Sequence, residues 1–244
     1  MLFYKAWRES ETRFLLSALT IVGLCGAFVF FHNEGAGLSD RPLNYVEFIW
    51  HIVYKGYLRQ LFMVLVLILG VGGLQRERDI GTAGFTLALP VSRLRLVFAR
   101  ALVGLLQVVC LSCLPALVIP ASSPLAGQSY PLAQAWQFSI LWSVGGIFSY
   151  VLGFLASTIF RGEYTAPVAA FLGLLLYSAL ADLPIAESYS LDIHDIMSGI
   201  GMPYFRAHDS LLIGPLPWVT LATFMCVALF LIALSGRITQ TQDF

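Results

Sequence analysis

Residues 94–119 read LRLVFARALVGLLQVVCLSCLPALVI. Residues 101–119 within this stretch carry no charged side chain, and as a helix they would be about 29 Å long. That length matches the hydrocarbon core of a lipid bilayer, which is about 30 Å thick. The stretch therefore predicts a transmembrane helix, with lipid as the main solvent around it.

Five other stretches of the chain have the same apolar character. They are Phe14–Phe31, a second span that begins between Lys55 and Leu61 and ends at Leu74, Trp136–Phe160, Thr165–Leu183 and Leu216–Ser235. Hydrophobic residues make up 58% of the 244 residues and charged residues 11%, whereas a soluble domain carries about 25% charged residues. The expected fold class is an all-α membrane protein with six transmembrane helices in a single domain over residues 1–244.

The distribution of basic residues predicts the orientation of the spans. Six spans place both termini on one side, and cytoplasmic segments of membrane proteins are enriched in Lys and Arg. With the termini in the cytoplasm, four basic residues lie outside, at Arg41, Lys55, Arg59 and Arg206. The other ten lie inside, at Lys5, Arg8, Arg13, Arg76, Arg78, Arg93, Arg95, Arg100, Arg161 and Arg237. The asymmetry therefore favours cytoplasmic N- and C-termini.

Two segments outside the expected spans also have a predicted structure. Residues 1–13 are amphipathic, with Phe3 and Trp7 on one side and Lys5 and Arg8 elsewhere, which is typical of a helix lying in the membrane interface. The extracytoplasmic loop at residues 184–215 is long for a connection in a helical bundle. We expect short helices in that loop.

A polar stripe precedes the second span. Glu47, His51, Lys55 and Arg59 recur every four residues, so on one helix they would form a slowly drifting polar face. One interpretation is an amphipathic helix at the outer surface of the membrane. The other is a polar lining on a substrate pathway.

A second four-residue repeat lies within the span at Trp136–Phe160. Its small residues are Gly145, Ser149, Gly153 and Ser157. Small residues at this spacing allow the backbones of neighbouring helices to approach closely. The seam they form is either static packing within one subunit or a moving or dimer-forming surface.

Several kinds of chemistry are missing from the sequence. The formal net charge is zero, which gives no indication of a nucleic-acid partner. The chain has no GxxxxGK[ST] nucleotide-binding loop and no HExxH metalloprotease helix, and no catalytic set converges within the expected spans. Possible metal-ligand types gather in the last outer loop at Asp192, His194, Asp195, His208 and Asp209, but their spacing matches no metal motif. We therefore expect no catalytic residue, no metal site and no cofactor in this chain.

The loop after the second span carries the strongest functional signal. It reads QRERDIGTAGFTLALPVSR over residues 75–93. An alternating-charge run is followed by Gly81, which permits a break in the helix, and by a short apolar stretch that Pro90 ends. Ser92 can then cap the third span. A short apolar helix in the cytosol needs a groove on a partner; the alternative is a connector lying on the membrane surface.

This loop resembles the corresponding loop of the permease subunits of type-2 ATP-binding-cassette (ABC) transporters. Those subunits carry a charged run, then Gly-Thr, an apolar stretch that ends in Pro-x-Ser-Arg, and a basic residue seven positions later. The matching residues here are Glu77, Arg78, Asp79, Gly81, Thr82, Leu87, Pro90, Ser92, Arg93 and Arg100, with Arg100 in place of the commoner Lys. Phe85 and Leu89 of the apolar stretch are spaced to lie on one face of a helix. Ala83 and Gly84 depart from the usual Leu-acidic pair.

The resemblance implies a mechanism and a set of partners. Residues 76–92 would form a cytoplasmic coupling helix that docks on a separate ABC ATPase subunit, and that ATPase would bind ATP and Mg. A second permease subunit, either a copy of this chain or a related one, would complete an ATP-driven exporter in a bacterial inner membrane. The alternatives are a secondary transporter, a structural membrane subunit without ATP coupling, and an intramembrane enzyme.

Overall fold

The computed structural model describes residues 2–31, 44–71, 92–160, 162, 164–181, 183, 192–200, 205–206 and 210–241. The elements in chain order are α1 (Leu2–Phe30), α2 (Tyr45–Ile49), the π-helix η2 (Trp50–Lys55), α3 (Tyr57–Gly70), α6 (Arg93–Ser122), the 3₁₀-helix η3 (Ser123–Ala126), α7 (Leu132–Ile159), α8 (Thr165–Ala181), α10 (Ile193–Ser198), β1 (Phe205–Arg206), β2 (Leu211–Leu212) and α11 (Trp218–Thr241). The expected all-α fold is confirmed. Its β-structure, in the described part of the chain, is the two-residue antiparallel ladder β1–β2.

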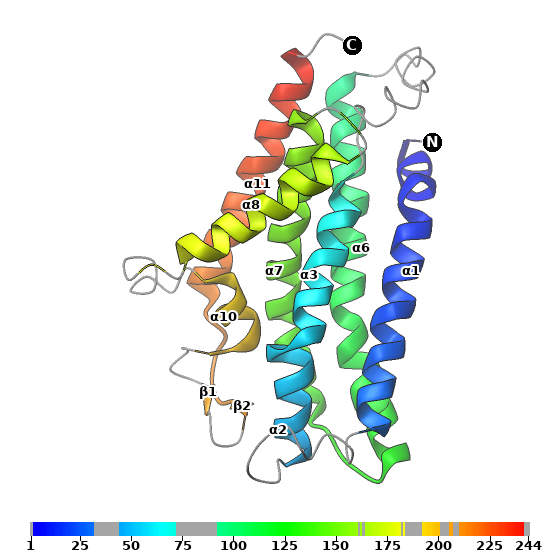
Figure 1. Cartoon of the computed structure of the whole chain (residues 1–244), viewed down its shortest axis with the longest axis vertical. Coiled ribbons are helices and arrows are strands. Elements are labelled where there is room, and N and C mark those ends of the chain that lie inside the picture. The colour runs from blue at the N-terminus through cyan, green and yellow to red at the C-terminus, as the bar shows by residue number, and fades with distance from the viewer. Residues whose placement is uncertain are drawn as a thin grey trace.

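Five stretches of helix are long and apolar enough to cross a membrane. They are Leu2–Phe30, Tyr45–Gly70, Leu94–Ala126, Leu132–Ile159 and Trp218–Thr241. The expected fifth span is the exception, because α8 is apolar but has only 17 residues and runs obliquely across the bundle (Figure 1). The chain is thus a multi-pass membrane protein with five long candidate spans and one shorter apolar helix.

Both termini lie at the same end of the bundle (Figure 1), and which side of the membrane that end faces stays a prediction. The first turn of α1 and the last turn of α11 lie at the same end, as an even number of passes requires (Figure 1). The end of α3 and the start of α6 lie at that end too, whereas α2, η3, α10 and the β1–β2 ladder lie toward the opposite end (Figure 1). The predicted helical structure between α8 and α11 is present in α10 and is accompanied by the ladder.

Two helix boundaries differ from the expected ones. The boundary expected near residue 13 is replaced by one continuous helix, because α1 runs from Leu2 to Phe30 and residues 2–22 contain neither Gly nor Pro to interrupt it. Placement of residues 2–13 in the membrane interface stays a prediction. The second candidate span begins at Tyr45, earlier than the expected Lys55–Leu61, and passes through η2 and a break at Gly56.

The central element of the bundle is α7, which packs against α3, α6, α8, α10 and α11. Its glycines allow these close contacts. A Cβ atom at Gly153 would lie 2.3 Å from the backbone oxygen of Leu67, and one at Gly145 would lie 2.2 Å from the sulfur of Met197. From α3, a Cβ at Gly70 would lie 2.2 Å from the oxygen of Tyr150. Gly145 and Gly153 of the four-residue repeat of small residues thus pack against other elements of the same chain.

Candidate functional site

The predicted coupling segment lies almost wholly outside the described residues. Glu77, Arg78, Asp79, Gly81, Thr82, Phe85, Leu87, Leu89 and Pro90 belong to the part of the chain that the structure does not describe. Ser92 is described, and its hydroxyl oxygen accepts a hydrogen bond from the backbone N–H of Arg95 at 3.4 Å. Ser92 is the N-cap of α6, as predicted, and Arg93 is the first residue of that helix.

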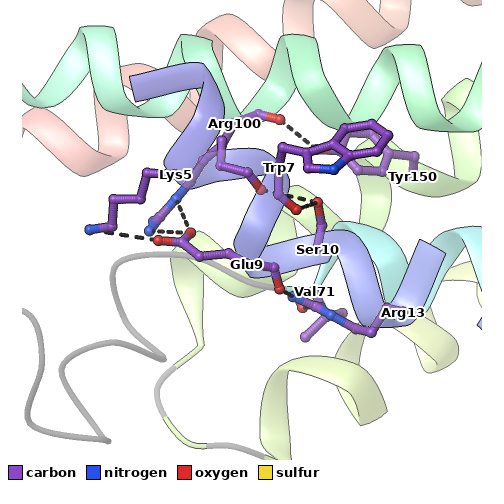
Figure 2. Close-up of polar contacts among 9 residues, drawn as sticks. Lys5, Trp7, Glu9, Ser10, Arg13, Val71, Arg100 and Tyr150 are labelled. Carbon is purple, nitrogen blue, oxygen red and sulfur yellow. Dashed lines mark hydrogen bonds and ion pairs between the residues drawn. The ribbon is translucent and has the colours of Figure 1, made fainter. Parts of the chain in front are cut away.

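The end of α3, where the segment begins, is held by α1. The guanidinium Nη1 of Arg13 donates to the backbone oxygen of Ile68 at 3.1 Å and to that of Val71. The last carbonyl groups of a helix have no partner within the helix and accept readily from basic side chains. Arg13 therefore caps the C-terminus of α3 from a different helix, as Figure 2 shows for Val71.

The beginning of α6, where the segment ends, is held by the same turns of α1. Glu9 Oε2 accepts from Arg100 Nη2 at 2.9 Å and from Arg100 Nε at 3.1 Å (Figure 2). Lys5 Nζ lies 3.6 Å from the other carboxylate oxygen of Glu9. The Arg100 side chain is only 11% exposed, so this ion pair is partly shielded from solvent. Arg100 is the final basic residue of the motif, and its partner Glu9 was not found from the sequence.

Further contacts surround this ion pair. Gln107 Nε2 donates to the Ser10 hydroxyl at 2.9 Å, and the Tyr150 hydroxyl donates to the backbone oxygen of Arg100 at 3.3 Å. The same Tyr150 is in close contact with Gly104 of α6. We call Glu9, Ser10, Arg13, Arg100 and Gln107 the α1 bracket, because they join α1 to both helices that flank residues 72–91.

Reversing the charges of the ion pair tests the α1 bracket. Glu9→Arg should lower the thermal stability of the purified protein by several degrees, because it removes a charge-assisted pair worth about 1–2 kcal/mol and adds a like charge. The double variant Glu9→Arg/Arg100→Glu should recover part of that loss. Melting curves of the single and double variants measure this. The single variant Arg100→Glu completes the comparison. If the double variant loses as much thermal stability as the two single variants together, the contact between Glu9 and Arg100 is contradicted.

The polar stripe does not form one face in the structure. Glu47 and Arg59 are both buried, at 9% exposed each, His51 is partly buried and Lys55 is exposed. Lys55 Nζ lies 5.4 Å from the centre of the Trp50 ring. The four-residue repeat fails because η2 is a π-helix and the helix breaks at Gly56. The four residues thus lie in separate environments, and a role for them at the outer surface or along a substrate pathway stays a prediction.

Arg59, one of the four basic residues expected outside, contacts another element of the bundle. It is buried, and its guanidinium donates to the backbone oxygen of His194 in α10. Asp192 and Asp195 lie within electrostatic range of it. A buried ionisable residue within a membrane span usually has a function or a structural partner. Here the partner is the short helix at the end of the bundle opposite the termini.

One of the possible metal ligands in the last outer loop, Asp192, has a structural role. Asp192 is the N-cap of α10, and its carboxylate oxygen accepts from the backbone N–H of His194 at 2.8 Å. His208 and Asp209 lie outside the described residues. Across the described ranges, no group of three or more His, Cys, Asp or Glu side chains could hold a metal ion.

Comparison of the chain with protein families, with curated proteins and with solved structures found no match. Helix length and hydropathy establish a multi-pass membrane protein.

Proposed function

We propose that this chain is the permease subunit of an ATP-driven exporter and that residues 76–92 couple it to a separate ATPase subunit. The observation that carries the proposal is the order of residues from Glu77 to Arg100. A charged run, Gly81-Thr82, an apolar stretch ending at Pro90, and then Ser92, Arg93 and Arg100 follow each other at the spacing of the type-2 permease loop.

The position of the flanking helices supports the proposal. Residues 72–91 connect the end of α3 to the start of α6, and these two ends lie at the same end of the bundle as the first turn of α1 (Figure 1). The excess of basic residues predicts that this end faces the cytoplasm. A connector there would be accessible to a cytoplasmic motor protein.

The α1 bracket gives the connector a mechanical link to the rest of the subunit. A force applied to residues 72–91 reaches Val71 on one side and the first turns of α6 on the other. Arg13 and Glu9 hold those two points on a single helix. Movement of the connector would therefore shift α1 together with α3 and α6, which is how a docked ATPase could change the arrangement of the spans.

The other parts of the proposal follow from the resemblance. ATP and Mg would bind to the partner ATPase, and this chain would have no catalytic residue. Two permease subunits, identical or related, would form the transport pathway in the lipid bilayer of a bacterial inner membrane.

Co-purification tests the proposal. The tagged full-length chain is co-expressed with the P-loop ATPase encoded nearest to its gene, solubilised in mild detergent and recovered by its tag. We expect the ATPase to be retained in stoichiometric amount and to hydrolyse ATP. Recovery of the chain without any ATPase, from membranes that contain both, would contradict the proposal.

Arg59 favours a second candidate, an ion-coupled secondary transporter, because such proteins use ionisable residues within their spans. In that case the chain alone, reconstituted in liposomes, would dissipate an imposed proton gradient without ATP, and Arg59→Gln would prevent this. Our proposal expects the gradient to be unaffected by the chain. A pH-sensitive dye enclosed in the liposomes distinguishes the two functions.

A further inference from the structure

A shallow groove of about 380 Å³ runs along the first half of α1. The residues that line it are Arg8, Glu11, Thr12, Leu15, Leu16 and Leu19. They are spaced three or four positions apart, so they form one stripe on the helix. The buried residues of α1, among them Ala6, Ser17 and Ile21, lie on the opposite face, and α1 packs against α6 and α3 at one side of the bundle (Figure 1). The groove therefore faces the surroundings of the bundle.

Two opposite charges meet at the end of the groove that is nearest the first turn of α1. Arg8 Nη1 donates to Glu11 Oε2 at 2.8 Å, and Thr12 adds an exposed hydroxyl to the same groove. The side chains of Arg8 and Glu11 are 62% and 30% exposed, and an exposed ion pair contributes little to stability. Both members of the pair are therefore available to a ligand that carries charges of its own.

The rest of the groove is apolar. Leu15, Leu16 and Leu19 are 55%, 60% and 71% exposed, and they belong to a helix that is apolar enough to cross a membrane. Residues 8–19 cover about 16 Å of helix, which is close to half of the roughly 30 Å hydrocarbon core of a bilayer. A charged end followed by an apolar body of this length matches one phospholipid within a single leaflet.

We propose that this groove binds a phospholipid whose headgroup carries a phosphate and a primary ammonium, which is the chemistry of phosphatidylethanolamine. The phosphate oxygens accept from the Arg8 guanidinium and the Thr12 hydroxyl, and the ammonium donates to the Glu11 carboxylate. The leucine side chains then lie along one acyl chain.

The charges of the groove select this headgroup over two others. Clusters of basic residues attract anionic lipids, whereas Arg8 and Glu11 together carry no net charge. A choline headgroup is neutral overall, but its quaternary ammonium has no N–H group to donate to Glu11. Only a headgroup with both an acceptor and a charged donor gives each member of the pair a hydrogen-bonding partner.

The α1 bracket keeps the groove turned outward. Glu9 binds Arg100 at 2.9 Å and Arg13 binds the backbone oxygen of Val71, and both contacts tie α1 to the bundle on the side away from the groove. Neither Arg8 nor Glu11 belongs to the α1 bracket. The lipid site is therefore independent of the proposed ATPase coupling, and either one could fail without the other.

Native mass spectrometry of the full chain in detergent tests the site. The purified protein is titrated separately with phosphatidylethanolamine, phosphatidylcholine and phosphatidylglycerol that have the same acyl chains. We expect one phosphatidylethanolamine per chain, bound at least about tenfold more tightly than either of the other lipids. Equal binding of the three lipids, a preference for phosphatidylglycerol, or a dimer of the chain that takes up none of them would overturn the proposal.

Single substitutions assign the binding to the groove. Glu11→Gln should abolish the preference for phosphatidylethanolamine over phosphatidylcholine, because it removes the carboxylate that accepts from the ammonium and leaves Arg8 in place. Arg237→Gln is the matched control, because Arg237 is an exposed basic residue near the end of α11, at the same end of the bundle (Figure 1). That variant should keep the preference. A preference that survives in Glu11→Gln would refute the headgroup site.

The apolar part of the groove is tested in the same titration. Leu19→Ala should weaken the binding of phosphatidylethanolamine several-fold, because it shortens the wall on which the acyl chain lies. Leu229→Ala is the control, since Leu229 is a 58% exposed residue in another candidate membrane span, α11. Equal affinities of the two variants for the lipid would show that the groove holds no acyl chain, and would contradict the proposal.

Discussion

Leu87→Asp is expected to release the ATPase from the chain while the protein still inserts and folds. If residues 85–89 dock in an apolar groove of the partner, a carboxylate at position 87 has to be buried without a counter-ion, which costs several kcal/mol. The amount of ATPase that co-purifies should fall at least about tenfold. Gly81→Pro should have the same effect, because it fixes the backbone at the expected break and removes an N–H donor.

Leu125→Asp is the matched control for this loss. Leu125 is 77% exposed and lies in η3, at the end of the bundle opposite the first turn of α1 (Figure 1). The Leu125 variant should keep the ATPase. Full retention of the ATPase by both Leu87→Asp and Gly81→Pro would refute the docking role of residues 76–92.

Gly153→Leu is expected to prevent the bundle from assembling. The first atom of any side chain at this position would lie 2.3 Å from the backbone oxygen of Leu67 and 3.5 Å from the Cα of Gly70. Backbone atoms cannot move aside without separating α7 from α3. The loss of stability should reach or exceed the roughly 1–3 kcal/mol typical of overpacked cores. Size-exclusion chromatography in detergent should show aggregated protein in place of a single folded species.

Gly26→Leu provides the control for this prediction. Gly26 also lies within a candidate membrane span, but a Cβ atom there meets no other atom within 4 Å. The Gly26 variant should elute and melt like the unsubstituted protein. A well-folded Gly153→Leu protein with an unchanged melting temperature would show that α3 and α7 do not approach as closely as the structure has them.

Hydrophobic length predicted the spans because it is a local property of the sequence. Residues 101–119 can be assigned to a membrane span from their own composition and length, without information on the helices they pack against. Two features of the sequence account for the differences in α1 and α8. Residues 2–22 lack any helix breaker, which favours the continuous α1 over a separate interfacial helix. The expected span at Thr165–Leu183 has only 19 residues, and α8 ends at Ala181 after 17 residues.

The α1 bracket could not be predicted from the sequence, because its partners are distant along the chain. Glu9 and Arg100 are 91 positions apart, and Arg13 and Val71 are 58 positions apart. Each charge alone fits an exposed cytoplasmic position equally well. The burial of Arg59 could not be predicted from the sequence either, because a four-residue repeat predicts one polar face only if the helix is regular. The π-helix at Trp50–Lys55 and the break at Gly56 remove that regularity.

Labelling of a single thiol at position 86 tests the central claim most directly. In a background without the four native cysteines, Thr86→Cys is treated with a membrane-impermeant maleimide in intact cells and in inverted membrane vesicles, with and without the ATPase. We predict labelling in the inverted vesicles only, at a rate that falls several-fold when the ATPase is present. Labelling from outside intact cells, or a rate in vesicles that the ATPase leaves unchanged, would contradict a cytoplasmic segment that docks on a motor protein.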